Sequence, residues 1–219
     1  MTVFKKTVFG AVVSGALMLV SHTAAAGDLV VSVTNDKGEP LENAVVSLTP
    51  KFQPTQTMPK GEDAEMRQQN TLFAPFVLPV QTGTNVSFPN FDEARHHVYS
   101  FSKAKRFELR LYGRDESRSI EFEQPGVVAL GCNIHDNMLA YIYVTDAPIF
   151  KKTDAQGKVE LLNLEDGQYD VDVWHPGQRN KGAPETMAVE VGGTPSELSL
   201  SIRLRRVWGQ QRPPADGQY

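Results

Sequence analysis

The sequence predicts an all-β protein. After residue 27 the apolar residues occur in short runs rich in Val, Leu, Ile, Tyr and Phe, separated by turns rich in Gly, Pro, Asn and Asp. No stretch of about 12 residues or more repeats its apolar positions with the period of a helix. Many short strands joined by such turns indicate packed sheets, and therefore β-sandwiches.

The predicted strands follow in chain order. Leu29–Val33 and Ala44–Leu48 come first, with a turn at 35–38 between them. The polar segment 51–70 contains two prolines and is expected to be a loop or linker, with room for one short helical turn at 64–69. The other predicted strands are Phe76–Val80, Asn85–Phe88, His97–Phe101, Phe107–Tyr112, Ser119–Phe122, Val127–Leu130, Ala140–Val144, Val159–Leu162, Tyr169–Trp174 and Glu197–Arg203.

The first 26 residues have the features of an export signal. Lys5 and Lys6 precede an uncharged apolar run over 8–20, and 24–26 are three alanines that suit a cleavage site. An uncleaved membrane anchor is the alternative, but the run is shorter than the roughly 20 apolar residues of a spanning helix. We therefore expect cleavage, a periplasmic protein, and no stable membrane span after cleavage.

The composition limits the function classes. The 219 residues allow one large or two small domains, and 40% hydrophobic residues suffice for a core. The formal charge of −4 becomes −6 when Lys5 and Lys6 are removed with the signal. We expect no nucleic-acid binding, which needs a basic face. The only cysteine, Cys132, cannot form an intramolecular disulfide, so in an oxidising compartment we expect it to be a ligand.

A set of soft and borderline metal ligands is the strongest functional signal. Cys132 is followed by His135 and Met138, and His96 and His97 lie upstream, where the predicted strand His97–Phe101 begins. A thiolate, two imidazoles and a weak thioether are the ligands of a blue-copper electron-transfer site. Successive side chains of a strand point to opposite faces, so only one of the two adjacent histidines can enter such a site.

Residues 71–146 resemble the cupredoxin family. The matching elements are 83–90 (GTNVSFPN), 96–98 (HHV) and 125–128 (PGVV), which leads to the C-x-x-H-x-x-M loop. This short loop is similar to that of amicyanin. The resemblance implies a Greek-key β-sandwich that holds one type 1 copper ion and has neither catalytic residues nor another cofactor. The metal ligands that it implies are His96, Cys132, His135 and Met138, with His97 in the place of the family's asparagine.

The segments on either side of this region resemble two halves of one module. Residues 31–46 and 153–171 are similar to the opening and closing parts of a carboxypeptidase regulatory-like domain, a small transthyretin-like β-sandwich. One enlarged sandwich or unrelated hairpins are the alternatives. Insertion at a loop costs little when the ends of the inserted domain are close together. The expected organisation is a signal peptide (1–26), a first half-module (27–56), a linker (57–70), a cupredoxin domain (71–146), a second half-module (147–206) and a disordered tail (207–219).

The resemblance implies a periplasmic carrier of single electrons rather than an enzyme. His135 would provide the electron path within an apolar patch containing Pro89, Ile134 and Leu139, and the partner would be a cytochrome, a dehydrogenase or an oxidase. Two alternatives use the same fold: a module for copper delivery or sequestration, and a structural envelope-binding protein with a vestigial cupredoxin fold.

Other polar residues are expected to have structural roles. We expect His175 to lie in a turn rather than to bind metal. The loop acids Asp154, Glu165 and Asp166 could bind calcium, but solvated turns are the preferred interpretation.

Overall fold

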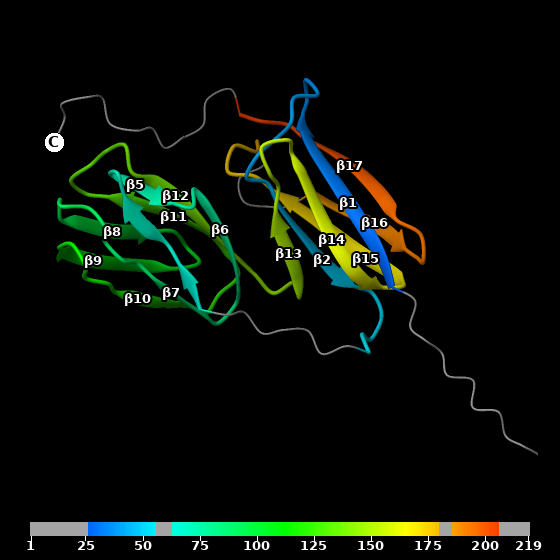
Figure 1. Cartoon of the computed structure of the whole chain (residues 1–219), viewed down its shortest axis with the longest axis horizontal. Coiled ribbons are helices and arrows are strands. Elements are labelled where there is room, and N and C mark those ends of the chain that lie inside the picture. The colour runs from blue at the N-terminus through cyan, green and yellow to red at the C-terminus, as the bar shows by residue number, and fades with distance from the viewer. Residues whose placement is uncertain (1–25, 56–62, 180–184, 206–219) are drawn as a thin grey trace, which may run out of the picture.

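The computed structural model describes residues 26–55, 63–179 and 185–205. These residues form strands, turns and loops without a helix, so the all-β prediction is confirmed. No helix in these ranges is long and apolar enough to cross a membrane. The predicted signal peptide, apart from Ala26, and the predicted disordered tail lie outside the described residues. Figure 1 shows the strands gathered into two bodies that lie side by side.

The first body is formed by the middle of the chain. A five-stranded sheet with the order β6-β12-β11-β8-β9 packs against a three-stranded sheet with the order β10-β7-β3, and β4 pairs with β5. The strands are β3 (Ala64–Glu65), β4 (Arg67–Gln69), β5 (Leu72–Ala74), β6 (Val77–Gln81), β7 (Thr84–Ser87), β8 (His96–Phe101), β9 (Arg106–Tyr112), β10 (Ser119–Phe122), β11 (Gly126–Cys132) and β12 (Leu139–Thr145).

Strand alternation determines what enters the core of this body. On β11, Val128, Leu130 and Cys132 are buried, while the residues between them lie on the outer face of the sheet. On β8, the buried residues are His96, Val98 and Ser100. A cysteine and a histidine therefore lie at one end of a mainly apolar core, because each belongs to the inward-facing row of its strand.

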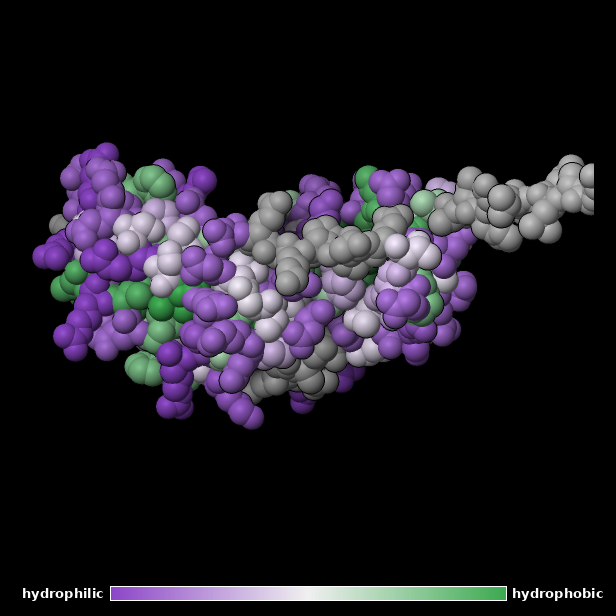
Figure 2. Space-filling view, turned by 90° about the horizontal axis from the view of Figure 1, so that it is seen from below, coloured by the Kyte–Doolittle hydropathy of each residue, from purple (hydrophilic) through white to green (hydrophobic). Residues whose placement is uncertain are grey.

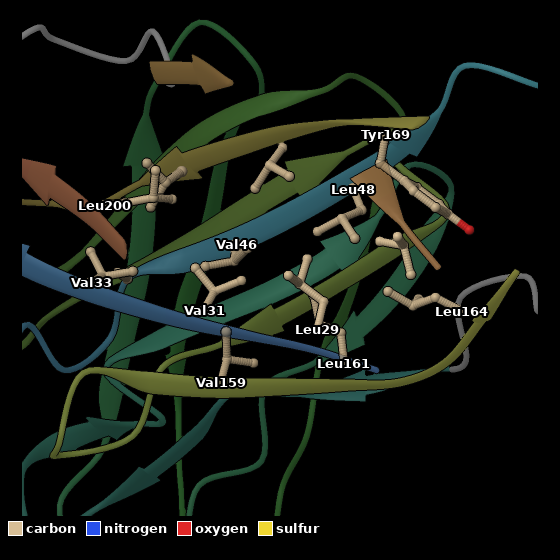
Figure 3. Packing of buried hydrophobic residues seen from close by; sticks show 14 of the residues in the cluster. Leu29, Val31, Val33, Val46, Leu48, Val159, Leu161, Leu164, Tyr169 and Leu200 are labelled. Carbon is tan, nitrogen blue, oxygen red and sulfur yellow. The ribbon is translucent and has the colours of Figure 1, made fainter. Parts of the chain in front are cut away.

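The second body is formed by both ends of the described chain. Its sheets have the orders β14-β1-β17 and β13-β2-β15-β16, and β17 pairs with β1 in parallel. Figure 3 shows its core, in which aliphatic side chains from β1, β2 and β14 interlock. The strands are β1 (Ala26–Asn35), β2 (Val45–Pro50), β13 (Ile149–Lys152), β14 (Lys158–Glu165), β15 (Gly167–Trp174), β16 (Glu185–Val191) and β17 (Ser196–Ile202).

An aromatic cluster joins the two bodies. The ring of Trp174, at the end of β15, stacks on Tyr143 of β12 with 5.0 Å between centroids and meets Tyr141 edge-on at 6.0 Å. Val45 and Val77 complete the buried part of this cluster. Trp174 is almost fully buried, so the two sandwiches are packed against each other through this junction.

The described part of the predicted loop at 51–70 differs from the expectation. Instead of a helical turn, residues 64–69 form β3 and β4, so the helical prediction is wrong. Met66 and Gln68 are fully buried, and their neighbours on either side point outward. Burial alternates regularly here, but four of the five residues of β3 and β4 are polar. The sequence therefore lacks the apolar alternation by which a strand is recognised. Strands β5, β13 and β16 were also not predicted.

Candidate metal site

Three side chains from different segments converge at one end of the first sandwich. His96 is the first residue of β8, Cys132 is the last residue of β11, and His135 lies in the loop that follows. The Cys132 Sγ is 3.8 Å from His96 Nδ1 and 3.7 Å from His135 Nδ1. One ligand atom from each residue lies within 4.8 Å of the other two. This triad is the only group of metal-ligating side chains of this kind among the described residues.

The donor spacing fits a first-row metal ion. Metal–nitrogen bonds of about 2.0–2.1 Å and a metal–sulfur bond of about 2.3 Å, the values for zinc, would place nitrogen and sulfur about 3.8 Å apart at trigonal angles. Both observed N–S separations match this value. A thiolate and two imidazoles in a trigonal arrangement are the donor set that distinguishes blue-copper sites from other metal sites.

The structure separates the two adjacent histidines. The His96 ring is fully buried and faces Cys132, whereas His97 lies on the outer face of the sheet. There its Nε2 is 2.9 Å from Glu108 Oε1, an approach that lacks the geometry of a hydrogen bond. The opposite directions of successive strand residues thus place one imidazole inside the site and the other outside it.

The loop between β11 and β12 returns to the same point. Asn133 donates a backbone hydrogen bond to the carbonyl of His97 at 3.2 Å, and the amide of Met138 donates to the carbonyl of His135 at 3.1 Å. The tight turn keeps His135 beside the end of β11. Met138 is buried in the same core cluster as Cys132, so the fourth predicted ligand lies in the apolar surroundings of the site.

A carboxylate holds the buried histidine in place. His96 Nε2 is 2.8 Å from Asp92 Oδ2, and the carboxylate of Asp92 also accepts hydrogen bonds from the amides of Asn70 and Thr71. An Nε2–H donated to this carboxylate leaves the Nδ1 lone pair directed at the site, which is the tautomer a metal needs. The amides at 70 and 71 belong to residues with positive φ angles of 56° and 54°, so Asp92 also stabilises an unfavourable turn.

Burial favours the neutral form of the same ring. Desolvation lowers the pKa of His96 from 6.5, and the neighbouring Asp92 opposes this shift without reversing it. A neutral imidazole is the form that binds a metal. Near neutral pH the His96 ring is therefore mostly neutral already, and binding a metal there requires little proton release.

The sequence-based prediction missed the residues that support the ligands. Asn90 receives the amide of Asp92 on its Oδ1 and donates to the carbonyl of Ala94 at 2.9 Å. Asn137 donates to the carbonyl of Thr71 at 2.8 Å and ties the ligand loop to the turn that Asp92 stabilises. The only sequence signal was an aspartate four residues before His96, which is common in loops and therefore weak.

The exposed surroundings of the site are partly apolar. His135 is half-buried, its neighbour Ile134 is 49% exposed, and Phe91 in the loop before β8 is 45% exposed. Leu139 and Pro89 are partly exposed. Figure 2 shows apolar side chains among hydrophilic ones on the surface of the first body. Scattered exposed apolar residues are ordinary, but Ile134 and Leu139 belong to or adjoin the ligand loop, and Phe91 precedes Asp92, the partner of His96.

The remaining polar candidates have structural roles. His175 is buried at a turn, where its Nδ1 accepts the amide of Gly177 at 3.0 Å. Asp154 accepts the amides of Gln156 and Lys158 within its own turn. The Glu165 carboxylate accepts hydrogen bonds from Thr55. Among the described residues, these acids do not form a group that could hold a metal.

Known structures resemble part of the chain only weakly. A purple cupredoxin from Nitrosopumilus maritimus is 22% identical, with a TM-score of 0.35, and covers 38% of this chain and 100% of its own. A Cu-containing nitrite reductase from Thermus scotoductus SA-01 is 24% identical over 44% of this chain and 25% of its own, with a TM-score of 0.37. A Cu(I) form of a mutant amicyanin is 14% identical over 46% of this chain and 98% of its own, with a TM-score of 0.35.

No protein-family model and no curated protein sequence matches the chain. Because TM-scores near 0.35 support no conclusion by themselves, the interpretation of the site rests on its own geometry.

Proposed function

We propose that this chain is a periplasmic type 1 copper protein that carries single electrons between redox proteins. The observation that supports the proposal most directly is the convergence of His96 Nδ1, His135 Nδ1 and Cys132 Sγ at trigonal spacing. Under this proposal these three residues and Met138 hold the ion. When bound, copper supplies reversible one-electron chemistry between Cu(II) and Cu(I).

The protein's own contribution is to keep the donor atoms still. Cys132 is held by the β11 ladder, and His96 by the β8 ladder and the carboxylate of Asp92. A site that barely moves between oxidation states needs little reorganisation, which favours fast electron transfer. The buried, apolar neighbours of Cys132 exclude water from the sulfur and thereby help to set the reduction potential.

The half-buried His135 is the proposed route for electrons to the surface. Within the triad, His135 is the residue that lies in a loop and is only half-buried, and its sequence neighbour Ile134 is exposed. A redox protein docking on the surrounding apolar residues would approach the ligand ring directly. We propose a cytochrome, a dehydrogenase or an oxidase as the partner, and no enzymatic activity for this chain itself.

We also propose that the second sandwich is a carboxypeptidase regulatory-like module interrupted by the copper domain. Its separate core and its strands from both ends of the described chain support this organisation. Its role would be to hold the copper domain in position through the aromatic junction at Trp174.

The proposal is tested by adding Cu(II) to residues 27–219 and recording optical and EPR spectra. We expect an intense blue thiolate-to-copper band and narrow copper hyperfine splitting, both abolished by Cys132→Ser. The adjacent histidines provide a matched pair: His96→Gln should remove the blue spectrum, while His97→Gln should leave it intact. A pale spectrum that does not change in Cys132→Ser would refute the type 1 site.

Electron transport requires a separate measurement. The copper-loaded protein should exchange electrons with a c-type cytochrome in a stopped-flow experiment, and Ile134→Lys should slow the exchange without changing the spectrum. If the blue site forms but exchanges no electrons with redox proteins and instead releases its copper to a copper chaperone, the chain is a copper-delivery protein.

A further inference from the structure

A groove between the two sandwiches has the chemistry of a ligand site. Its volume is about 780 Å³, and it is lined on one side by strands of the first sandwich and on the other by the segment after β15 and the end of the described chain. Grooves of roughly 300–1,000 Å³ at domain junctions are frequent binding places for small molecules. It is distinct from the candidate metal site, since none of the four predicted ligands lines it.

Aromatic side chains form much of this groove. Phe101 on β8 is 76% exposed, the largest exposure among the big apolar side chains described, and Tyr141 and Trp174 line the same space. Removing the apolar area of an aromatic ring from water is favourable in free energy, and an exposed ring does not gain this stabilisation. A flat apolar body in the groove would cover Phe101 and lie against Tyr141, close to the almost fully buried Trp174.

Two cations also line the groove. Lys103 and Arg205 face it, and no carboxylate is found among its described lining residues. Neither cation forms an ion pair with any described residue, although the chain as a whole carries a net negative charge. This local positive charge on an acidic protein is complementary to an anion.

Arg205 has an unused donor at this place. Its Nη2 donates to the carbonyl of Pro176, and its backbone amide donates to the carbonyl of Gly177 at 2.9 Å, so the side chain is anchored at the groove. Its Nε is buried and has no hydrogen-bond partner among the described residues. A buried N–H without a partner is costly, and a guanidinium presents its donors in a fork that matches a carboxylate.

We propose that this groove binds a small aromatic carboxylate. The carboxylate would pair with Arg205 and Lys103, and the ring would lie against Phe101 and Tyr141. The proposal depends on neither the metal site nor the electron-transfer function. One feature connects the two regions: Phe101 packs on Tyr99 with 5.1 Å between ring centroids, and Tyr99 lies directly over Gly131, the neighbour of Cys132.

Binding is measured by tryptophan fluorescence in the full chain. The sequence has two tryptophans, so Trp208→Phe leaves Trp174, in the groove, as the only reporter. Benzoate, benzamide and inorganic phosphate are titrated separately. We expect benzoate to change the fluorescence saturably with a Kd of about 1 mM, and the neutral amide and the ring-free anion to bind about tenfold more weakly or not at all.

Two arginines of the same segment provide the matched variants. Arg205→Gln should weaken benzoate binding about tenfold or more, because it removes a charge-assisted pair. Arg203→Gln removes the same charge two residues away, from a side chain that does not line the groove, and should change the Kd less than twofold. Amide NMR spectra of the unmodified chain should show benzoate-dependent shifts at Ser102, Lys103, Val127 and Gln178.

Each contrary result overturns a stated part of the proposal. Equal affinity for benzamide would show that the anion is not recognised, and equal affinity for phosphate would show that the ring is not. Equal losses in the two arginine variants would indicate a general charge effect rather than this site. Absence of both fluorescence and NMR changes at 10-fold the expected Kd, about 10 mM, would exclude binding altogether.

Discussion

The two sandwiches have similar architecture but bury different chemistry. The second sandwich has an aliphatic core closed by Tyr169. The hydroxyl of its buried Thr153 donates to the carbonyl of Leu41 and accepts from the amide of Ala44. The first sandwich buries His96 and Cys132 within its core. Buried polar groups are costly unless they are paired. A fold that needed only stability would therefore use an aliphatic core like that of the second sandwich. The aliphatic core of the second sandwich fits a role in stability, and its buried His175 lies outside this core in a turn, whereas the buried His96 of the first sandwich faces Cys132.

The polar groups of the first sandwich also form a network. The hydroxyl of Tyr112 donates to the carbonyl of Phe88 at 2.7 Å, and Gln68 donates to the same carbonyl at 3.1 Å. Burial raises the pKa of Tyr112 to about 12, so the phenol remains a neutral donor. Hydrogen-bonded networks of this kind stiffen a core. Gln68 also exchanges backbone hydrogen bonds with Pro89 and Phe91, next to Asp92, while its own Oε1 has no hydrogen-bond partner among the described residues.

Loss of packing in the second sandwich should give the largest effect on stability. Leu48→Ala deletes a fully buried side chain of β2 and should lower the free energy of unfolding by about 2–5 kcal/mol. Denaturant unfolding measures this loss. The copper spectrum of the folded variant should match that of the parent, because Leu48 belongs to a different core from the ligands. A changed spectrum would mean that the two sandwiches do not serve separate purposes.

The buried His175 makes the second sandwich sensitive to acid. Burial lowers the pKa of His175 from 6.5 to about 4. Between these values the unfolded chain binds a proton that the folded chain does not, so stability falls as the pH drops from 6.5 towards 4, by up to about 3 kcal/mol. Unfolding of the metal-free protein should show this loss in the parent. His175→Asn keeps an acceptor for Gly177 without titrating, and an unchanged pH slope in this variant would contradict the assignment.

The carboxylate beside His96 should affect metal affinity more than the stability of the fold. Asp92→Asn removes the charge that orients His96 and should weaken metal affinity about 10- to 100-fold. The amide oxygen of the asparagine still accepts a hydrogen bond from the turn at Asn70 and Thr71, so the variant should fold. Competition with a copper chelator measures the affinity. Glu93→Gln neutralises the next carboxylate, which pairs with Arg114 on the surface, and should leave the affinity unchanged. Equal losses in both variants would point to overall charge rather than to ligand orientation.

The parts of the site that could be predicted from the sequence follow from the alternating directions of successive side chains in a strand. The predicted strand Val127–Leu130 places Val128 and Leu130 on one face, and in the structure this inward row continues to Cys132 inside the first core. The same period required one of the adjacent histidines to face away. Asp92 was not predictable, because its role depends on the amides of Asn70 and Thr71, which the chain brings to it only after folding. The assignment of Met138 as a ligand remains a prediction.

Local patterns also failed where packing decides the structure. Residues 64–69 are too polar to look like strands, yet β3 and β4 form because β7 and β5 supply hydrogen-bonding partners. Trp174 was recognised as the end of a strand, but its contacts with Tyr141 and Tyr143 join parts of the chain about 30 residues apart in sequence.

The sequence by itself determined the all-β class, most strands and the residue types available as ligands, because these depend on side-chain chemistry and a period of two residues. Only the tertiary structure decided which histidine faces Cys132, what orients it, and where the groove between the sandwiches lies. Those features arise from contacts between distant segments, whose distances no local pattern specifies.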